Sequence, residues 1–511
     1  MHHALLTPDI IVLIVAQFLP TEGQFTDYCS LAALARTSHA FHEAALNALW
    51  HTQIGIVNLI KCMPLDLWEE IMSGLKFVRP VVPNDWERFD YYAYRVRSVL
   101  AYRAISSPER ERMISPVRLL DDVYIAIRQC RPSAPLLPNV QTLSWSRLFH
   151  VTSFPFIEMF YGPQLSSLTL LSFDISCAET LPLIARIPKL LPELCKLSLH
   201  LWPGIGRDVG GRPNSFAVPP GTLSALRNLR ELTLYSDLPI PYYLEMFRYE
   251  AILNSREFVL PGPLILPPPG LINLQLLSHT LSPCKSILEL SHYSSLRYIS
   301  VTASHDIPKL IGLFFRALHD HCSHTALQEL HITVGRIAIN ATDSRPELTS
   351  ESASFHWLYV FSSLQRLVVH LAPNVHLNDR DLEDMAAAWP EIRELSFNRE
   401  VIIVPPFSPA ITWNGVVSLA RHCHNLQTLG IDFNVSGSNV PQGDFSSDVI
   451  PNRTVTTLIL GHSSLGGDPR EAVAAVLGLF PNLENVEILL VLSSNFWIRV
   501  AFVAFKLVRV G

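Results

Sequence analysis

The turn Gly461-His462-Ser463-Ser464-Leu465-Gly466 contains the residues of this sequence that come nearest to a catalytic motif. In one large class of hydrolases, a strand-to-helix turn with the pattern G-x-S-x-G exposes a nucleophilic serine, and an acid and then a histidine follow it along the chain. Here the spacing is longer by one residue, and no histidine follows His462. Because such a turn needs Gly and Ser for its backbone in any case, the sequence predicts a structural turn. A divergent hydrolase acting through Ser463 stays as an alternative.

Histidine and cysteine gather at two places that raise the question of a metal site: His319, His321, Cys322 and His324, and then His422-Cys423-His424. A structural zinc site needs four ligands, usually in two spaced pairs. Successive helical residues point about 100° apart, so neighbours in one helix do not converge on one ion. Both runs are typical of helix C-termini, where histidine suits the helix dipole. The sequence therefore predicts no metal, no cofactor and no catalytic residue, and a protein that is not an enzyme.

Composition favours a globular chain with a large core, since 49% of the 511 residues are hydrophobic and only 16% are charged. A net charge of −6 without any basic run argues against a nucleic-acid partner. The apolar stretch 10–19 is too short to span a membrane, and 496–510 is interrupted by Arg499, Lys506 and Arg509. Eight scattered cysteines without C-x-x-C spacing or a secretory signal predict free thiols in the cytoplasm or nucleus.

The main body repeats one short phrase, apolar-x-x-apolar-x-apolar, in twelve copies whose first residues lie 25 to 42 positions apart. In the last three positions the two apolar residues share one face of a short strand, because side chains alternate along a strand. Stacked copies bury that face in a parallel sheet with a continuous core. The twelve copies begin at Val140, Leu165, Leu194, Leu229, Leu271, Leu296, Leu327, Leu364, Ile392, Leu426, Val455 and Leu483.

Helical spacing of apolar residues predicts helices between the phrases, over 309–321, 380–389, 413–424 and 470–480. A strand followed by a helix, many times over, resembles the leucine-rich repeat family. That resemblance implies an α/β solenoid with parallel strands and outer helices. The alternative is a non-repeating α/β domain whose strands merely begin with leucine.

The first fifty residues predict three short helices whose common core is too small for the apolar surface they offer. Thr7 and Ser30 are expected to cap the first and second helices, with Pro8 in the opening turn of the first. The segments that carry this pattern are Leu5-Leu6-Thr7-Pro8-Asp9-Ile10-Ile11, the run from Ser30-Leu31 to Ala40-Phe41, and Ala48-Leu49-Trp50.

These segments resemble an F-box, with phrasing similar to the large F-box families of mushroom-forming fungi. The resemblance implies docking on a Skp-type adaptor, and through it on a cullin and a RING protein in an SCF ubiquitin ligase. It also implies the adaptor contacts Leu6, Pro8, Ile11, Ile14, Leu31 and Leu34. The alternative is a three-helix cap for the repeat array.

The sequence thus predicts an F-box-like domain over 1–52, a helical connecting segment of fixed geometry over 53–130, and about twelve repeats over 131–511. The expected function is the substrate-recognition subunit of an SCF-type E3 ligase, which acts by proximity. A repeat scaffold without ligase attachment is the alternative. The target protein would contact the strand residues between the core leucines, which suit a protein partner in their mixed chemistry: Lys196, His200, Glu231, Tyr235, Tyr298, His331, Arg366, His370 and Glu394.

Overall fold

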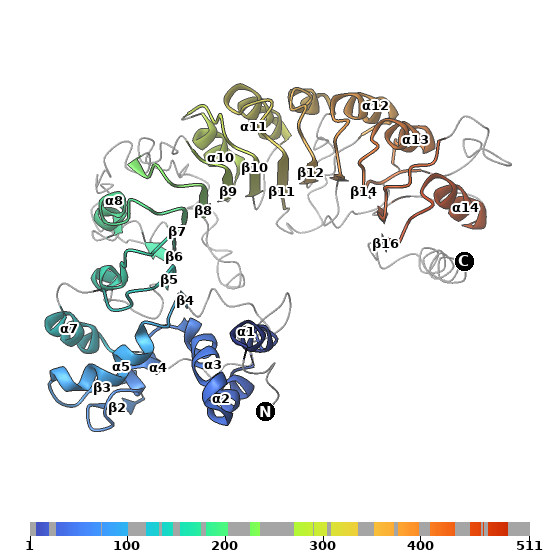
Figure 1. Cartoon of the computed structure of the whole chain (residues 1–511). Coiled ribbons are helices and arrows are strands. Elements are labelled where there is room, and N and C mark those ends of the chain that lie inside the picture. The colour runs from blue at the N-terminus through green and yellow to red at the C-terminus, as the bar shows by residue number, and fades with distance from the viewer. Residues whose placement is uncertain are drawn as a thin grey trace. The chain divides into compact units, whose positions relative to one another are not determined.

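The computed structural model covers the whole chain (Figure 1). The chain forms two compact units. Unit 1 comprises Met1–Leu229 and Leu234–Leu238, and unit 2 comprises Arg230–Thr233 and Pro239–Gly511. The residues that the structure describes are 7–19, 27–72, 74–100, 119–131, 135–146, 154–174, 180–202, 225–235, 270–278, 280–289, 291–303, 308–335, 352–371, 377–397, 409–434, 450–460, 463 and 469–488.

A parallel sheet of 14 strands in chain order is the main element of the described residues. In unit 1 it contains β1 (Thr52–Ile54), β4 (Ser98–Leu100), β5 (Thr142–Ser146), β6 (Ser167–Asp174) and β7 (Lys196–Trp202). The residues of β8 (Glu231–Tyr235) are shared between the two units. In unit 2 the strands are β9 (Asn273–Ser278), β10 (Tyr298–Ala303), β11 (Glu329–Val334), β12 (Arg366–Leu371), β13 (Glu394–Phe397), β14 (Thr428–Gly430), β15 (Thr457–Leu460) and β16 (Asn485–Ile488).

Each of the twelve predicted phrases contains the start of one of the strands β5 to β16. The strand always begins two residues after the leading apolar residue of the phrase. Every leading residue is buried, from Val140 at 0% exposed to Leu483 at 5%. The predicted α/β arrangement with a parallel, solenoid-like sheet is therefore confirmed. The sheet is larger than predicted, because β1 and β4 extend it toward the N-terminus.

One hydrogen-bond pattern keeps neighbouring strands in phase. The carbonyl just before one strand accepts two successive N–H groups at the start of the next strand. The Arg297 carbonyl accepts from Gln328 and Glu329, both at 2.9 Å, and the Gln328 carbonyl accepts from the next pair along the chain. The same pattern begins at Arg97 in unit 1 and extends to Thr456 in unit 2. Equivalent residues of the repeats therefore stand side by side.

Helices α10 to α13 cover one side of the strands of unit 2 (Figure 1). This arrangement explains the strand pattern, in which apolar residues on the helix side are buried and alternate residues are partly open, as in β11. The predicted helices are confirmed to within two residues. The helices of this unit are α10 (Leu281–Leu288), α11 (Pro308–His321), α12 (Asp379–Ala388), α13 (Trp413–His422) and α14 (Pro469–Leu479), with a 3-10 helix η9 (Ser352–Leu358).

Three helices open unit 1 as predicted: α1 (Pro8–Ala16), α2 (Tyr28–Thr37) and α3 (His39–His51), together called the three-helix segment. Their caps differ from the prediction. The Thr7 side chain makes no capping hydrogen bond, and Asp27 rather than Ser30 caps α2, accepting from the Ser30 N–H at 2.9 Å. Ser38 caps α3. Asp27 outcompetes Ser30 because a carboxylate three residues ahead accepts an N–H that a serine inside the helix cannot.

The segment 53–130 is not purely helical as predicted. It completes β1 and contains β4, and also holds an antiparallel pair, β2 (Trp68–Ile71) and β3 (Gly74–Phe77). Its apolar residues are too few per strand for the alternation that marks a strand in sequence. Its helices, with those that follow in unit 1, are α4 (Val57–Lys61), η2 (Pro83–Asp85), α5 (Trp86–Ala93), α7 (Asp121–Cys130), η5 (Phe154–Phe160) and α8 (Thr180–Leu190).

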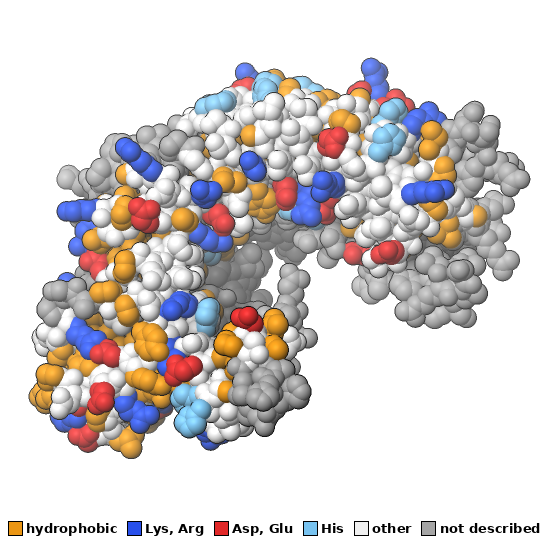
Figure 2. All heavy atoms as spheres, viewed as in Figure 1, with side chains coloured by type: hydrophobic (Ala, Val, Ile, Leu, Met, Phe, Trp, Pro, Cys, Tyr) orange, Lys and Arg blue, Asp and Glu red, His pale blue; other side chains and the backbone are white. Residues whose placement is uncertain are grey.

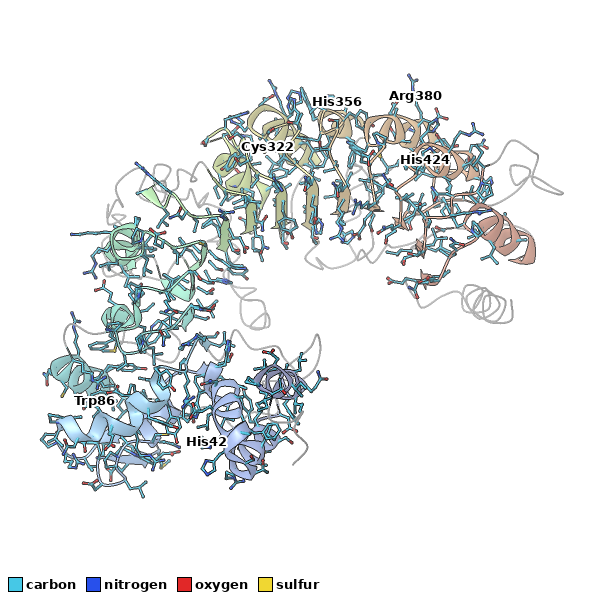
Figure 3. The ribbon with its side chains drawn as sticks, viewed as in Figure 1. His42, Trp86, Cys322, His356, Arg380 and His424 are labelled. Atoms are coloured by element: carbon cyan, nitrogen blue, oxygen red, sulfur yellow. The ribbon has the colours of Figure 1, made fainter. Side chains whose placement is uncertain are left out.

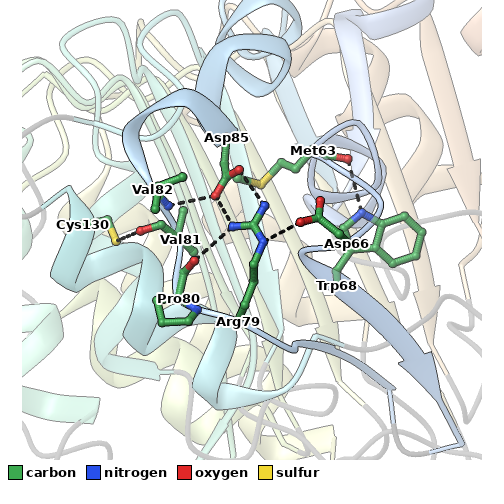
Figure 4. A network of polar contacts seen from close by, with 9 residues as sticks. All are labelled: Met63, Asp66, Trp68, Arg79, Pro80, Val81, Val82, Asp85 and Cys130. Carbon is green, nitrogen blue, oxygen red and sulfur yellow. Dashed lines mark hydrogen bonds and ion pairs between the residues drawn. The ribbon is translucent and has the colours of Figure 1, made fainter.

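An ionic network around Arg79 fixes this segment (Figure 4). Arg79 donates to Asp66 at 2.8 Å and to both oxygens of Asp85 at 2.7 and 2.9 Å. Asp85 also accepts from the Val82 N–H at 2.8 Å, and its residue is only 4% exposed. The hydrogen bonds from Arg79 lower the pKa of Asp85 below its ordinary value. The network ties the turn before β2 to η2, so the connecting segment has a defined geometry.

Candidate functional surfaces

The first candidate surface is the outer side of helix α1. Val12 and Leu13 are 59% and 64% exposed, whereas Ile11 and Val15 on the opposite side are each 5% exposed. Figure 2 shows apolar side chains open on the surface of the three-helix segment. After Asp9 in its first turn, the helix carries only apolar side chains, and a three-helix core can cover only one of its sides. Its outer side is therefore available to another chain.

The residues predicted as adaptor contacts occupy different positions in this segment. Ile11 and Leu31 belong to the core cluster with Val15 and Phe41, and in this structure they hold the helices together. Ile14 and Leu34 pack partly against that cluster, and Pro8 is exposed. Leu6 lies outside the described residues. Sequence reasoning missed Val12 and Leu13, although the uninterrupted apolar run from Ile10 to Ala16 was the available signal.

The three-helix segment is joined closely to the rest of unit 1. The Arg95 side chain is 1% exposed, and its Nη2 lies 2.8 Å from the Glu43 carboxylate of α3. Arg95 also donates to Asn47 and lies over the rings of Tyr91 and Tyr94 at 4.9 and 4.8 Å. The rings of Trp50 and Tyr92 stack at 4.4 Å. These contacts join α3 to α5 and to the turn that leads from α5 to β4, and α3 also continues directly into β1.

The second candidate surface is the side of the unit 2 strands opposite the helices, called the strand face. At the first position of three neighbouring strands, Glu329, Arg366 and Glu394 stand directly opposite one another. Arg366 lies 3.6 Å from each carboxylate. Their side chains are between 25% and 50% exposed. Figure 2 shows acidic and basic side chains close together on the visible face of this unit.

Aromatic residues adjoin these charges. Tyr298 on β10 stands opposite Glu329, and its ring meets that of His331 edge to face at 5.3 Å. Burial lowers the pKa of His331, with Arg366 acting in the same direction and the carboxylates of Glu329 and Glu394 opposing it. The side chain is therefore neutral at pH 7. His370 on β12 is only 5% exposed, so that predicted target contact is not accessible from solvent.

In unit 1 the predicted contacts Lys196, His200 and Tyr235 also lie at strand positions between core leucines. The His200 and Tyr235 rings stack at 5.1 Å, and His200 Nε2 lies 3.2 Å from the Ser198 hydroxyl. Burial lowers the pKa of His200. Lys196 is exposed, and Glu231 at the start of β8 is partly exposed.

The serine turn has a structural role in this conformation. The Ser463 hydroxyl accepts from the Phe433 N–H at 3.0 Å and donates to the Ile431 carbonyl at 3.3 Å. The side chain is buried, at 3% exposed, so it bridges two repeats. His462 lies outside the described residues.

The histidines of the two runs considered as metal sites likewise form hydrogen bonds with nearby backbone carbonyls. His321 bonds to the Ser291 carbonyl at 3.2 Å and His324 to the His319 carbonyl at 2.9 Å. Cys322 is 1% exposed, and burial raises its pKa to about 12. Cys322, His356 and His424 come from separate elements and do not converge (Figure 3). Within the described ranges no group of three or more His, Cys, Asp or Glu could hold a metal ion.

A membrane-crossing helix is also absent from the part of the chain that the structure describes, since none of its helices is both long and apolar enough. The chain matches no protein-family model, and a search among curated proteins returned no match. The functional interpretation therefore depends on the two surfaces described above, the outer side of α1 and the strand face of unit 2.

Proposed function

We propose that this chain is the substrate-recognition subunit of an SCF-type E3 ubiquitin ligase, with the three-helix segment as its F-box and the strand array as leucine-rich repeats. The single observation that carries the proposal is the exposed apolar side of α1, with Val12 and Leu13 at 59% and 64% exposed. An unpartnered apolar surface on so short a helix fits a partner chain better than solvent.

The mechanism of the proposal is proximity. A Skp-type adaptor covers α1 and links the chain to a cullin-RING ligase, while a target protein binds the strand face. The ligase then transfers ubiquitin to a target lysine whose effective concentration is raised by binding. The chain contributes no side-chain catalysis to this reaction and needs no cofactor. Such a complex would work in the cytoplasm or nucleus.

The close junction between α3 and the first strands supports this function. Transfer by proximity requires that the adaptor-bound part and the first repeats keep a fixed geometry. The buried Arg95, held between Glu43 and the rings of Tyr91 and Tyr94, limits movement at that junction. A flexible tether would dilute the effective concentration of the target lysine.

The test is a pull-down of the full chain with a purified Skp-type adaptor. The variant Val12→Asp/Leu13→Asp is expected to lose binding, because two charges would replace the apolar contact. Leu65→Asp is the matched control, since Leu65 is 81% exposed in unit 1 but lies outside the three-helix segment. Equal binding by all three chains would reject α1 as the adaptor surface.

A chain that is folded but binds no adaptor would favour the second candidate, a leucine-rich-repeat scaffold without ligase attachment. In that case α1 to α3 act as a cap for the array. Circular dichroism of each preparation distinguishes this outcome from unfolding.

A further inference from the structure

We propose that this chain carries arginine in place of lysine, so that it is a poor acceptor for the ubiquitin that its own ligase complex transfers. The inference rests on the proposed function, because it takes the chain to be a subunit of such a complex. It adds a property of the receptor itself, which is resistance to modification while the bound target is modified.

The basic residues of the sequence are strongly biased toward arginine. Of the 39 basic residues, 32 are arginine and seven are lysine. Between Lys309 and Lys506 lie 196 residues that include 11 arginines and no lysine. The first 60 residues also lack lysine. The two proposed binding regions, the three-helix segment and the strands β11 to β16, therefore contain no lysine side chain.

The chemistry of ubiquitin transfer distinguishes the two basic residue types. The neutral ε-amine of a lysine attacks the carbonyl carbon of a thioester between ubiquitin and a cysteine of the conjugating enzyme. An isopeptide bond forms, the carbon–sulfur bond breaks, and the departing thiolate takes up the proton that the amine releases. An arginine guanidinium stays protonated in proteins and is no nucleophile. Arginine therefore supplies the same surface charge without an acceptor for ubiquitin.

Ion pairing does not explain the bias. Arginine is favoured where its planar fork binds a carboxylate through two bonds, as Arg79 binds Asp85. Other arginines are exposed and form no side-chain hydrogen bond or ion pair with another residue that the structure describes, so a lysine would serve equally well there. Six such positions are Arg128, Arg230, Arg297, Arg380, Arg393 and Arg453.

Most lysines with a described side chain are held in ion pairs. The Lys61 ammonium lies 2.6 Å from the Glu70 carboxylate, and the Lys76 ammonium lies 2.6 Å from that of Glu69. Lys285 lies 2.7 Å from the carboxylate of Glu289, one helical turn away. Each ammonium must leave its carboxylate before it can react, so these lysines are also poor acceptors.

The experiment introduces lysine at exposed arginines of unit 2. The full chain is assembled with a purified Skp-type adaptor, cullin, RING protein, conjugating enzyme and ubiquitin, and ubiquitin on the chain is followed over time by immunoblot. Arg297→Lys/Arg393→Lys should be modified about fivefold faster than the wild type, because both positions adjoin the strand face where a target lysine is proposed to be presented. Mass spectrometry should locate the added ubiquitin at these two positions.

The matched control is Arg297→Gln/Arg393→Gln, which removes the same two charges without adding an amine. It should be modified as slowly as the wild type. Discharge of the thioester to free lysine in solution shows that each assembled complex is active. Labelling with an amine-specific acylating reagent shows that the introduced lysines are accessible, and thermal unfolding excludes misfolding of either variant.

Two outcomes would overturn the inference: equal rates for the wild type and the lysine variant in an active complex, or an equal increase in the glutamine variant. Either result would show that the arginine bias has no protective effect. The adaptor pull-down on the same preparations tests the proposed function separately. Adaptor binding with equal rates rejects only the protective role of arginine, whereas a folded chain that binds no adaptor rejects the ligase attachment and this inference with it.

Discussion

Helix α1 and strand β11 are both rich in apolar residues, but only the strand is covered by its own chain. In β11, Leu330, Ile332 and Val334 are each at most 1% exposed. In α1, Val12 and Leu13 remain 59% and 64% exposed. A strand in an array is covered by its neighbours and by the helices beside them, whereas a three-helix core is too small to surround a helix whose residues from Ile10 to Ala16 are all apolar. This difference in coverage is the reason for proposing a partner at α1 and none for the core of the strand array.

The largest expected effect on stability tests whether the strand array is well packed by residues of its own chain. Leu330→Ala should lower the free energy of unfolding by about 3 kcal/mol, because it leaves a cavity at a fully buried position. Urea unfolding followed by circular dichroism measures the change. A loss below about 1 kcal/mol would show that the array is loosely packed and would remove the contrast with α1.

A polar contact between repeats should have the next largest effect. The Asn452 side chain is buried and donates to the carbonyls of Ala420 and Cys423 at 3.0 and 2.9 Å. Asn452→Ala should cost about 2 kcal/mol of unfolding free energy, because two hydrogen bonds to buried carbonyls are lost.

The control for this variant is Asn482→Ala. Asn482 makes a similar bond to the Arg453 carbonyl at 2.8 Å, but at an exposed position. Its loss should cost less than about 0.5 kcal/mol, since water replaces the donor. Equal costs at the two positions would contradict a dominant role for burial.

The connecting segment should respond to acid through Asp85. Its pKa in the folded chain is lowered, chiefly by hydrogen bonds from Arg79, and the ordinary value is about 3.9. The stabilisation is therefore fully present above pH 3.9 or so and is lost as the pH falls through the lower, folded pKa. Asp85→Asn should be less stable than the wild type at pH 7, and the difference should shrink below pH 4. Urea midpoints at several pH values measure it, and a constant difference would exclude the Arg79 pair as its cause.

The smallest expected effect concerns stability at the outer side of α1. Leu13→Ser should change the unfolding free energy by less than about 0.5 kcal/mol, because the side chain is already mostly in water. Thermal unfolding measures this. A loss as large as that of Leu330→Ala would show that Leu13 is covered within the chain, and it would remove the basis for a partner at α1.

The sequence predicted the strands of the array because their pattern is local. Leading residues such as Leu327 and Leu364 are buried where predicted, since an apolar triad with the spacing L-x-x-L-x-L must turn one face to the core. The helices between them follow from apolar periodicity for the same reason. The three N-terminal helices were also predicted, although α2 begins at Tyr28, three residues before the start that a cap at Ser30 implies.

Other features of the fold depend on contacts between residues that are distant in the sequence. No local sequence pattern predicts such contacts. Strands β1 and β4 pair with each other across 43 intervening residues, which neither short segment reveals. The choice of Asp27 over Ser30 as a cap depends on where the backbone turns into α2. The burial of Ile11 and the exposure of Leu13 depend on how three helices pack. The grouping of Glu329, Arg366 and Glu394 required the strand register, although Arg366 and Glu394 were each predicted as strand-face contacts.

The carbonyl that two N–H groups share at the start of β5 to β7 and of β9 to β16 has a genetic consequence. It fixes the start of each of these strands by the backbone of the previous repeat, whatever the number of residues between the two strands. Leading residues are accordingly separated by as few as 25 and as many as 42 positions, while the strands stay in phase. Insertions and deletions between strands can therefore accumulate in the gene without shifting the side chains that the strands present. Related genes could diversify in length while keeping an unchanged set of strand residues, or change those residues while keeping their length.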